Sequence, residues 1–172
     1  MFMKGLFSVK KGEKLAELIA PVNGTVIPES DIPDVAFASG MLGHGFGIIP
    51  SDGEFYSPVN GVVIDVTPTK HAYSIKSDEG AEILIHIGID TVELKGDGFV
   101  SEVARGDKIS VGTPLAHVEL DSIKSHNLSP ITAVIIINHD ILSQITVFEG
   151  ACKAKETTVL SYVSADNKKQ ER

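Results

Sequence analysis

Short runs of β-branched and aromatic residues alternate with glycine and proline along most of the chain. Such runs, bounded by turn residues, are typical of β-strands. Strands are predicted over residues 24–28, 46–50, 61–66, 72–77, 82–88, 108–111, 114–119, 132–137 and 157–163. Helical signals are confined to 12–18 and 139–145, without the strand–helix alternation of a parallel sheet. The predicted fold is therefore all-β, an antiparallel β-sandwich or barrel-like structure with few short helices.

One motif occurs twice, as PVNGTVI at residues 21–27 and as PVNGVVI at residues 58–64. Each copy holds an Asn-Gly pair, which suits a tight hairpin turn because both residues tolerate positive φ. A third stretch, GDKISVGTPL at residues 106–115, again places β-prone residues between glycine-bearing turns. The chain is therefore predicted to contain an internal repeat, a hybrid motif, within one sandwich.

The length of 172 residues fits a single domain, and 42% hydrophobic with 22% charged residues is ordinary for a globular protein. We expect that domain over residues 16–165, between a flexible N-terminal segment, 1–15, and a frayed polar tail, 166–172. Asp and Glu number 23 against 15 Lys and Arg, which gives a net charge of −8. This acidity argues against nucleic acid and favours basic or neutral protein partners.

The single cysteine, Cys152, excludes a disulfide framework and fits a reducing compartment. The longest dense apolar stretch, residues 131–137, is far shorter than the roughly 20 residues of a membrane-spanning helix. The N-terminal residues also lack the apolar run of a secretory signal. A cytoplasmic protein without stable membrane insertion is expected.

The segment from 70 to 94 carries the candidate chemistry, because it places two histidines on one predicted hairpin. A loop centred between Asp78 and Glu79 pairs residues whose numbers sum to 157, so His71 is predicted to lie opposite His86. Directly opposed residues have Cβ atoms about 5 Å apart on the same face. Strand alternation puts the isoleucines at 83, 85, 87 and 89 on the core face and turns His86 away from the core.

Two facing imidazoles can perform covalent group transfer, because a neutral histidine is a nucleophile near pH 7. The second ring can then donate a hydrogen bond to a phosphoryl group carried by the first. Thr69 precedes His71 by two residues and is positioned to orient its ring. Gly88 follows His86 by two residues, and its missing side chain is expected to leave room for a phosphate.

A zinc site made by two histidines and a carboxylate is the alternative, with Asp90 as the nearest acid. On a regular strand His86 and Asp90 would lie about 13 Å apart, so one metal could join them only if the chain turned after Gly88. A purely structural role for one histidine is the remaining interpretation.

Several motifs together resemble the IIA component of the bacterial glucose-type phosphotransferase system. They are APVNGTV at 20–26, IPDVAFASGMLGHGFGIIP at 32–50, HAYSI at 71–75 and HIGIDTVELKGDGF at 86–99. The resemblance implies a largely antiparallel β-sandwich that accepts a phosphoryl group from phosphohistidine on HPr and passes it to a cysteine of a IIB domain. It makes His86 the phosphorylated residue, through Nε2, and His71 the phosphate-stabilising partner, supported by Thr69.

The resemblance also implies a docking surface for these protein partners. It maps an apolar depression onto Val35, Phe37, Met41, Leu42, Ile48 and Ile87, with Asp34 and Asp90 on its rim. Acids around an apolar patch suit a basic partner. No cofactor is required, although zinc between His71 and His86 at a partner interface stays open.

Two other functional classes are kept as alternatives. Some relatives regulate transporters or kinases, so the chain could be a regulatory or binding module with the IIA fold. The repeat and the H-x-x-x-D spacing at 86–90 also resemble zinc-dependent peptidoglycan endopeptidases, but the H-x-H motif of those hydrolases is absent from the sequence.

Overall fold

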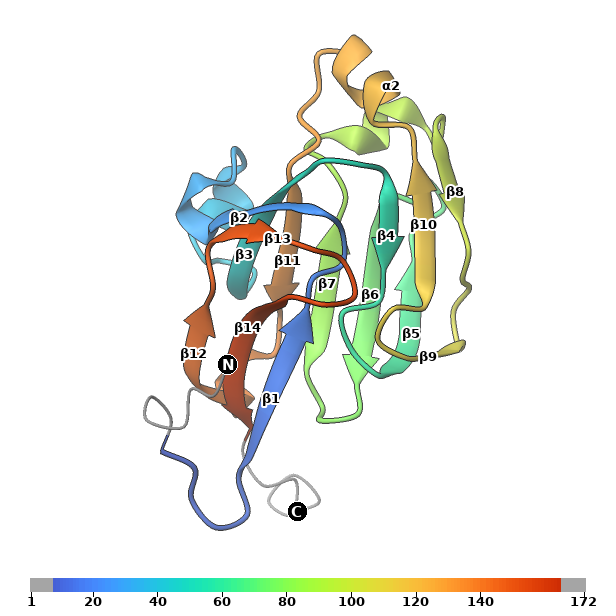
Figure 1. Cartoon of the computed structure of the whole chain (residues 1–172). Helices are drawn as coiled ribbons and strands as arrows, with labels where there is room; N and C mark the ends of the chain where they lie inside the picture. Colours follow the sequence, from blue (N-terminus) through green and yellow to red (C-terminus); the bar gives the residue numbers. More distant parts are fainter. Residues whose placement is uncertain (1–7, 165–172) are drawn as a thin grey trace.

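The computed structural model describes residues 8–164, which form a sandwich of antiparallel strands (Figure 1). Within this range the strands make three sheets, with the orders β1-β14-β12, β4-β10-β8 and β13-β2-β3-β11-β7-β6-β5-β9. The strands are β1 (Lys14–Ile19), β2 (Gly24–Pro28), β3 (His44–Pro50), β4 (Glu54–Tyr56), β5 (Gly61–Val66), β6 (Ala72–Ser77), β7 (Glu82–His86), β8 (Phe99–Ser101), β9 (Lys108–Ile109), β10 (Pro114–Val118), β11 (Thr132–Ile136), β12 (Leu142–Val147), β13 (Gly150–Cys152) and β14 (Thr158–Ser164). The helical elements are η1 (Glu29–Asp31), α1 (Val35–Ala38), η2 (Thr91–Leu94), α2 (Leu120–Ser125) and η3 (His139–Ile141).

The predicted fold class is confirmed, and each predicted strand range overlaps a strand of the structure. The predicted helix at 12–18 is wrong, because β1 occupies most of that range. Of the predicted helix at 139–145 only the first turn is helical, as η3, and β12 begins at Leu142. Both strands pair antiparallel with β14. In β1 the burial alternates, with Ala16 and Leu18 inside, so tertiary pairing overrides the helix propensity of Lys, Leu, Ala and Glu. The short strands β4, β8 and β13 were also not predicted.

Of the two predicted terminal segments, 1–15 and 166–172, the structure describes only residues 8–15. β1 begins at Lys14, so the last two residues of the predicted loose segment 1–15 belong to a strand. Ser8 is also attached, because its N–H donates to Oε1 of Gln144 at 2.9 Å and its carbonyl accepts from Nε2 at 2.7 Å. The rest of that expectation, residues 1–7, and the tail 166–172 lie outside the described residues.

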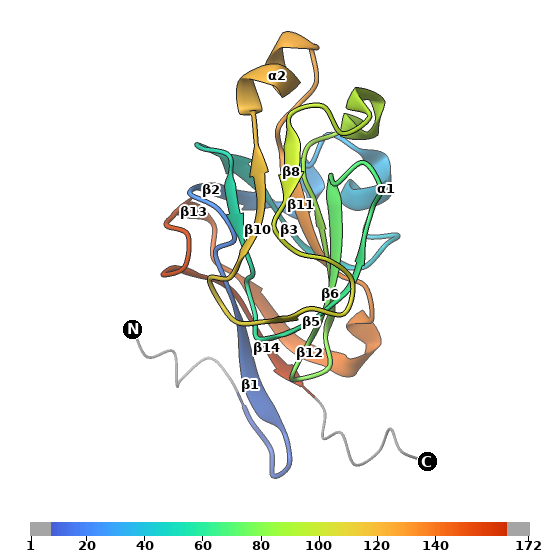
Figure 2. The ribbon, with the colours of Figure 1, turned by 90° about the vertical axis from the view of Figure 1, so that its right-hand side faces the viewer.

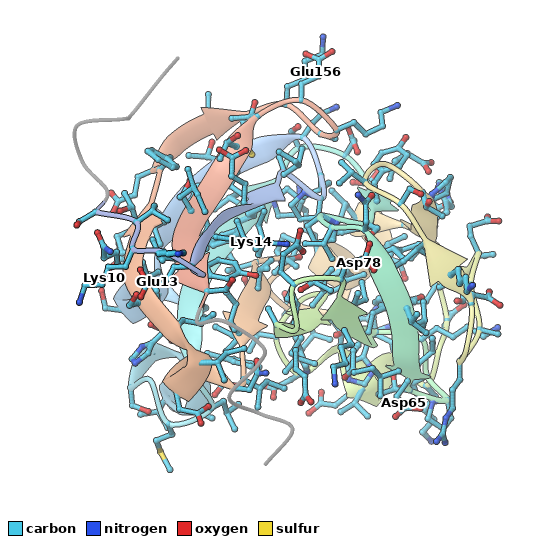
Figure 3. All side chains as sticks on the ribbon, turned by 90° about the horizontal axis from the view of Figure 1, so that it is seen from below. Lys10, Glu13, Lys14, Asp65, Asp78 and Glu156 are labelled. Atoms are coloured by element: carbon cyan, nitrogen blue, oxygen red, sulfur yellow. The ribbon has the colours of Figure 1, made fainter. Side chains whose placement is uncertain are left out.

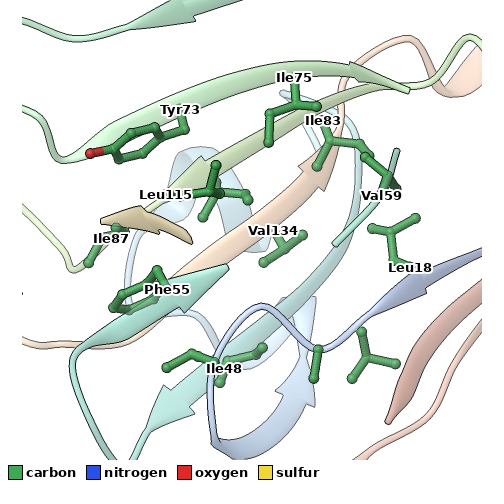
Figure 4. Close-up of a cluster of buried hydrophobic side chains, with 14 of the residues drawn as sticks. Leu18, Ile48, Phe55, Val59, Tyr73, Ile75, Ile83, Ile87, Leu115 and Val134 are labelled. Atoms are coloured by element: carbon green, nitrogen blue, oxygen red, sulfur yellow. The ribbon is translucent and has the colours of Figure 1, made fainter. Parts of the chain in front are cut away.

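The main core lies between the sheets and is built by strand alternation (Figure 4). Tyr73 and Ile75 of β6 and Ile83 and Ile85 of β7 all point inward and are fully buried. Burying one such side chain stabilises the fold by about 1.5–3 kcal/mol. Charged side chains, among them those of Asp65 and Asp78, lie on the outside (Figure 3).

A second, smaller cluster covers the outer face of the eight-stranded sheet. Its buried members are Ile32, Phe37, Ile89, Ala133 and Ile135. Ile89 belongs to this cluster and not to the main core, since β7 ends at His86 and the chain turns at Gly88. The regular alternation predicted through residue 89 is therefore wrong beyond Ile87.

The repeat is visible as matching hydrogen bonds around the two copies of the motif. The N–H of Ile19 donates to the carbonyl of Pro58 at 3.0 Å, and the N–H of Tyr56 donates to the carbonyl of Pro21 at 2.7 Å. The two copies thus hold each other through reciprocal bonds. The side chains of Asn23 and Asn60 also match, because each accepts a backbone N–H from a distant loop, at 2.8 and 2.9 Å.

The Asn-Gly pairs do not form the predicted tight hairpin turns. Gly24 and Gly61 begin β2 and β5, and neither has a positive φ. A Cβ on either residue would lie 2.1 Å from a backbone carbonyl oxygen, that of Ile49 for Gly24 and that of Lys76 for Gly61. Glycine is therefore needed in both copies for the close approach of the neighbouring strand, not for backbone freedom.

We expect Gly61→Ala to lower the free energy of unfolding by about 2–4 kcal/mol, because the new methyl group must displace the backbone of β6. Gly106→Ala is the matched control, since open space surrounds that position and only its positive φ of 94° opposes a side chain, at about 1 kcal/mol. Urea denaturation measures both variants. Equal losses would show that strand approach does not explain Gly61.

Candidate functional site

The hairpin that carries the two histidines is shifted by one residue from its predicted register. Ala72 lies opposite His86 and Tyr73 opposite Ile85, so paired numbers sum to 158 and not to 157. The cause is the loop, where Gly80 has φ 93° and the N–H of Ser77 donates to the carbonyl of Ala81 at 2.8 Å. A loop with an odd number of residues and a glycine in the left-handed region is a common hairpin connection.

The two imidazoles nevertheless meet. Their ring centroids are 4.9 Å apart and the rings stand at 83°, edge to face. His71 precedes β6 and follows Lys70, which has φ 60°, so strand alternation does not govern its direction. The carbonyl of His71 accepts the N–H of Ile87 at 2.7 Å and keeps the loop beside β7. The turn before β6 and this cross-strand hydrogen bond therefore bring the rings together, although the two histidines are not directly opposite each other.

The ring of His86 is fixed by the backbone that follows it. Its Nδ1 lies 2.8 Å from the carbonyl oxygen of Gly88. A carbonyl can only accept, so Nδ1 is the donor and carries the proton. In the neutral ring Nε2 then holds the free lone pair. The backbone thus selects the nitrogen that is available for chemistry.

Gly88 makes this contact possible through its backbone, with φ 78°. A Cβ there would lie 2.3 Å from Cγ2 of Thr91 and 3.1 Å from the carbonyl oxygen of Ser129. The place that a side chain of Gly88 would take is thus occupied by Thr91 and Ser129. That a phosphate can approach His86 near Gly88 stays a prediction. Glycine is required because the turn needs a left-handed residue without a side chain.

His71 is held by side chains from its own loop. Oγ1 of Thr69 lies 2.6 Å from its Nδ1, and Oγ1 of Thr67 lies 3.4 Å from the same atom. The residue is buried, with 7% of its surface exposed. Burial, followed by the neighbouring His86, lowers the pKa of His71 to about 4. The ring is therefore neutral at pH 7. Sequence reasoning found Thr69 but missed Thr67, whose role depends on the shape of the loop.

Burial lowers the pKa of the half-buried His86 below its ordinary value. The hydrogen bond to Gly88 and the charges of Asp34 and Asp90 act in the opposite direction. Asp34 also caps α1, where its Oδ1 accepts the N–H of Ala36 at 2.9 Å. Asp90 has φ 58° and is exposed. The chain turns before Asp90, so the separation from His86 expected for a regular strand does not apply.

The predicted docking residues fall into two groups. Val35 and Met41 are each 78% exposed and Leu42 is 42% exposed, whereas Phe37 is buried with its ring centroid 5.2 Å from that of His86. Figure 2 shows α1, which begins at Val35, on one side of the sandwich together with η2.

Ile48 and Ile87 cannot belong to a docking surface, because both are fully buried in the main core (Figure 4). That part of the prediction is wrong, and strand alternation had already placed Ile87 on the core face. Val92, in η2 beside Asp90, is 52% exposed and was not among the predicted docking residues. Its signal in the sequence was weak, because an isolated valine after a turn is equally consistent with a core position.

Residues 8–164 contain no group of three His, Cys, Asp or Glu side chains placed to hold a metal ion.

The same part of the chain has no helix long and apolar enough to span a membrane.

The described residues thus form a β-sandwich in which two imidazoles are in contact and each has a hydrogen-bonding partner at Nδ1. The family model of the phosphoenolpyruvate-dependent sugar phosphotransferase system, EIIA 1, matches residues 16–142, so the chain belongs to this family. It is a phosphocarrier of sugar uptake, as its motifs predicted.

Relatives match nearly the whole chain. The glucose-specific EIIA component of Staphylococcus aureus is 43% identical over 161 residues, which cover 93% of this chain and 97% of that protein. The glucose-specific EIIA component of Halalkalibacterium halodurans is 44% identical over 171 residues, covering 94% and 97%. The structure of glucose permease IIA from Mycoplasma capricolum has a TM-score of 0.79 and 35% identity, covering 86% of this chain and 96% of that one.

We expect the ring of His71 to stay neutral down to about pH 4 in the folded protein, whereas it titrates near 6.5 in the unfolded chain. Between these values the unfolded chain binds more protons, so acidification from pH 6.5 to 4 lowers the free energy of unfolding. The loss from this group is at most about 3 kcal/mol. Imidazole NMR titration and urea denaturation at several pH values measure it. His71→Gln should flatten the dependence, and a midpoint near 6.5 in the folded protein would contradict the prediction.

We expect Gly88→Ala to release the ring of His86 from its fixed tautomer, because the new methyl group moves the Gly88 carbonyl away from Nδ1. Long-range ¹H–¹⁵N spectra report which ring nitrogen carries the proton. Thr91→Ser is the control, since it removes Cγ2 but keeps the hydroxyl that donates to the carbonyl of Ile87. An unchanged Nδ1–H tautomer in Gly88→Ala would refute this role of Gly88.

Proposed function

We propose that the chain accepts a phosphoryl group on Nε2 of His86 from the phosphohistidine of HPr and passes it to the cysteine of a IIB domain. The observation that carries the proposal is the hydrogen bond from Nδ1 of His86 to the Gly88 carbonyl, which leaves Nε2 with its lone pair. Glucose is the sugar named for the relatives, so a glucose permease is the first candidate for the receiving system.

The transfer needs no proton to move. The lone pair of Nε2 attacks phosphorus, the bond from phosphorus to the HPr nitrogen breaks, and its electron pair returns to the HPr imidazole. The proton on Nδ1 of His86 stays in place, and the positive charge gained by the ring is stabilised by the Gly88 carbonyl, Asp34 and Asp90. In the second step the IIB thiolate attacks phosphorus, and the electron pair returns to Nε2.

His71 serves this reaction as a neutral hydrogen-bond donor. When the hydroxyl of Thr69 donates to Nδ1, the proton of the neutral ring lies on Nε2 and can be given as a hydrogen bond to the phosphoryl oxygens on His86. The low pKa of His71 means that it is not a proton source near pH 7. Its contribution is to position and stabilise charge that develops in the transition state.

The exposed apolar side chains of Val35, Met41 and Leu42, close to Asp34, suit a partner with an apolar contact surface and a basic rim. The net charge of −8 supports electrostatic steering of such partners. Zinc would find two imidazoles here and need further ligands, which a partner would have to supply.

The test is to incubate the protein with phosphoenolpyruvate, enzyme I and HPr and to measure its intact mass. We expect one acid-labile phosphate on the native protein and none on His86→Ala. His71→Gln should still be phosphorylated, but with onward transfer to IIB slowed about 100-fold.

Absence of phosphate on the native protein, with HPr shown to be charged, would refute the proposal. Phosphate retained on His86→Ala would move the acceptor to another residue.

A further inference from the structure

The loop between β5 and β6 contains a hydroxyl that the proposed reaction does not yet use, that of Thr67. The loop starts as a turn, in which Pro68 follows Thr67 and the N–H of Lys70 donates to the carbonyl of Thr67 at 2.8 Å. Proline suits this position because its φ is preset for a turn. The turn thus occupies the carbonyl of Thr67.

Ala72, the first residue of β6, makes its bonds to Thr67 in an unusual way. The N–H of Thr67 donates to the carbonyl of Ala72 at 3.1 Å. The N–H of Ala72 donates to Oγ1 of Thr67, also at 3.1 Å, where a regular antiparallel pair would use the carbonyl. The side chain of Thr67 therefore replaces a backbone acceptor and clamps the residue that follows His71.

The same oxygen faces the ring of His71. Oγ1 of Thr67 is 3.4 Å from Nδ1 and 3.4 Å from the carbonyl oxygen of Ala72, while Oγ1 of Thr69 is 2.6 Å from Nδ1. Oγ1 of Thr67 accepts from the N–H of Ala72, and its single proton can point either to the Ala72 carbonyl or to Nδ1 of His71. Turned toward the ring, this hydroxyl joins that of Thr69 as a donor to Nδ1, which favours the tautomer with the proton on Nε2.

We propose that Thr67 is a positioning residue for phosphoryl transfer, which holds His71 in place through Ala72 and favours the tautomer with the proton on Nε2. This inference rests on the proposed function, because the Nε2 proton matters only if a phosphoryl group is carried by His86. The hydroxyl of Thr67 acts on this ring in two ways. Its bond from the N–H of Ala72 fixes where His71 lies, and its contact with Nδ1 favours the proton on Nε2.

The experiment compares Thr67→Val, which keeps the shape but removes the hydroxyl, with Thr67→Ser, which keeps it. We expect Thr67→Val to alter the imidazole ¹⁵N shifts of His71 and to slow phosphoryl transfer to IIB by about tenfold. The final phosphate content after charging by HPr should stay at that of the native protein. Thr67→Ser should restore both signals, and Thr25→Val, an exposed threonine on β2, should change neither.

Native shifts for His71 and native transfer rates in a folded Thr67→Val protein would overturn the proposal. If that variant does not fold, Thr67→Cys provides a weaker acceptor and donor of similar size. For Thr67→Cys we expect His71 shifts and a transfer rate that differ from the native values in the same direction but by less than in Thr67→Val. Values equal to the native ones would again overturn the inference. Failure of the native protein to take up phosphate would refute the proposed function, while the tautomer spectra would still decide whether Thr67 acts on His71.

Discussion

The hydrogen bond from Nδ1 of His86 to the carbonyl of Gly88 is the constraint on which the rest of the site depends. It requires a left-handed backbone at Gly88, which is tolerated because the residue has no Cβ to collide with Thr91 and the Ser129 carbonyl. The turn at Gly88 is itself held by hydrogen bonds on both sides. Thr91 donates to the carbonyl of Ile87, and the N–H of Ile89 donates to the carbonyl of Ser129 at 2.9 Å. Main-chain geometry thus leaves Nε2 of His86 with its lone pair, and in the proposed transfer this arrangement needs no reorganisation.

The two rings are held by different means that suit different tasks. His86 is tied to a backbone carbonyl, so its protonated atom is fixed whichever way neighbouring side chains rotate. His71 is tied to the hydroxyls of Thr69 and Thr67, which can donate or accept. Burial lowers the pKa of both rings and so favours their neutral forms, in which Nε2 of His86 keeps its lone pair. A neutral pair also avoids the repulsion that two adjacent imidazolium ions would suffer.

Strand periodicity predicted most of the sheet, and its failures have local physical causes. β1 was mistaken for a helix because helix-forming residues occupy a strand that is stabilised by β14. The hairpin register was wrong by one because loop length cannot be derived from turn composition, and Gly80 adopts the left-handed conformation. For Ile87 two lines of reasoning disagreed: alternation placed it in the core and resemblance placed it on the docking surface, and the structure agrees with alternation. Thr67 could not be found at all, since its bonds exist only once the loop has closed.

The repeat explains why the site draws on distant parts of the chain. The pairs β2–β3 and β5–β6 are matching hairpins on opposite sides of β11 and β7, in the centre of the same sheet. The connection of the second hairpin is short and delivers His71 directly beside β7. The connection of the first is long, because it leaves β2 at the far end of the sheet and must fold back over the outer face to place Phe37 on His86. Gly47 permits this return, since a Cβ there would lie 2.9 Å from the side chain of Ile32. Similar hairpins with unequal connections thus bring His71 to His86 from one side of the sheet and Phe37 from the other.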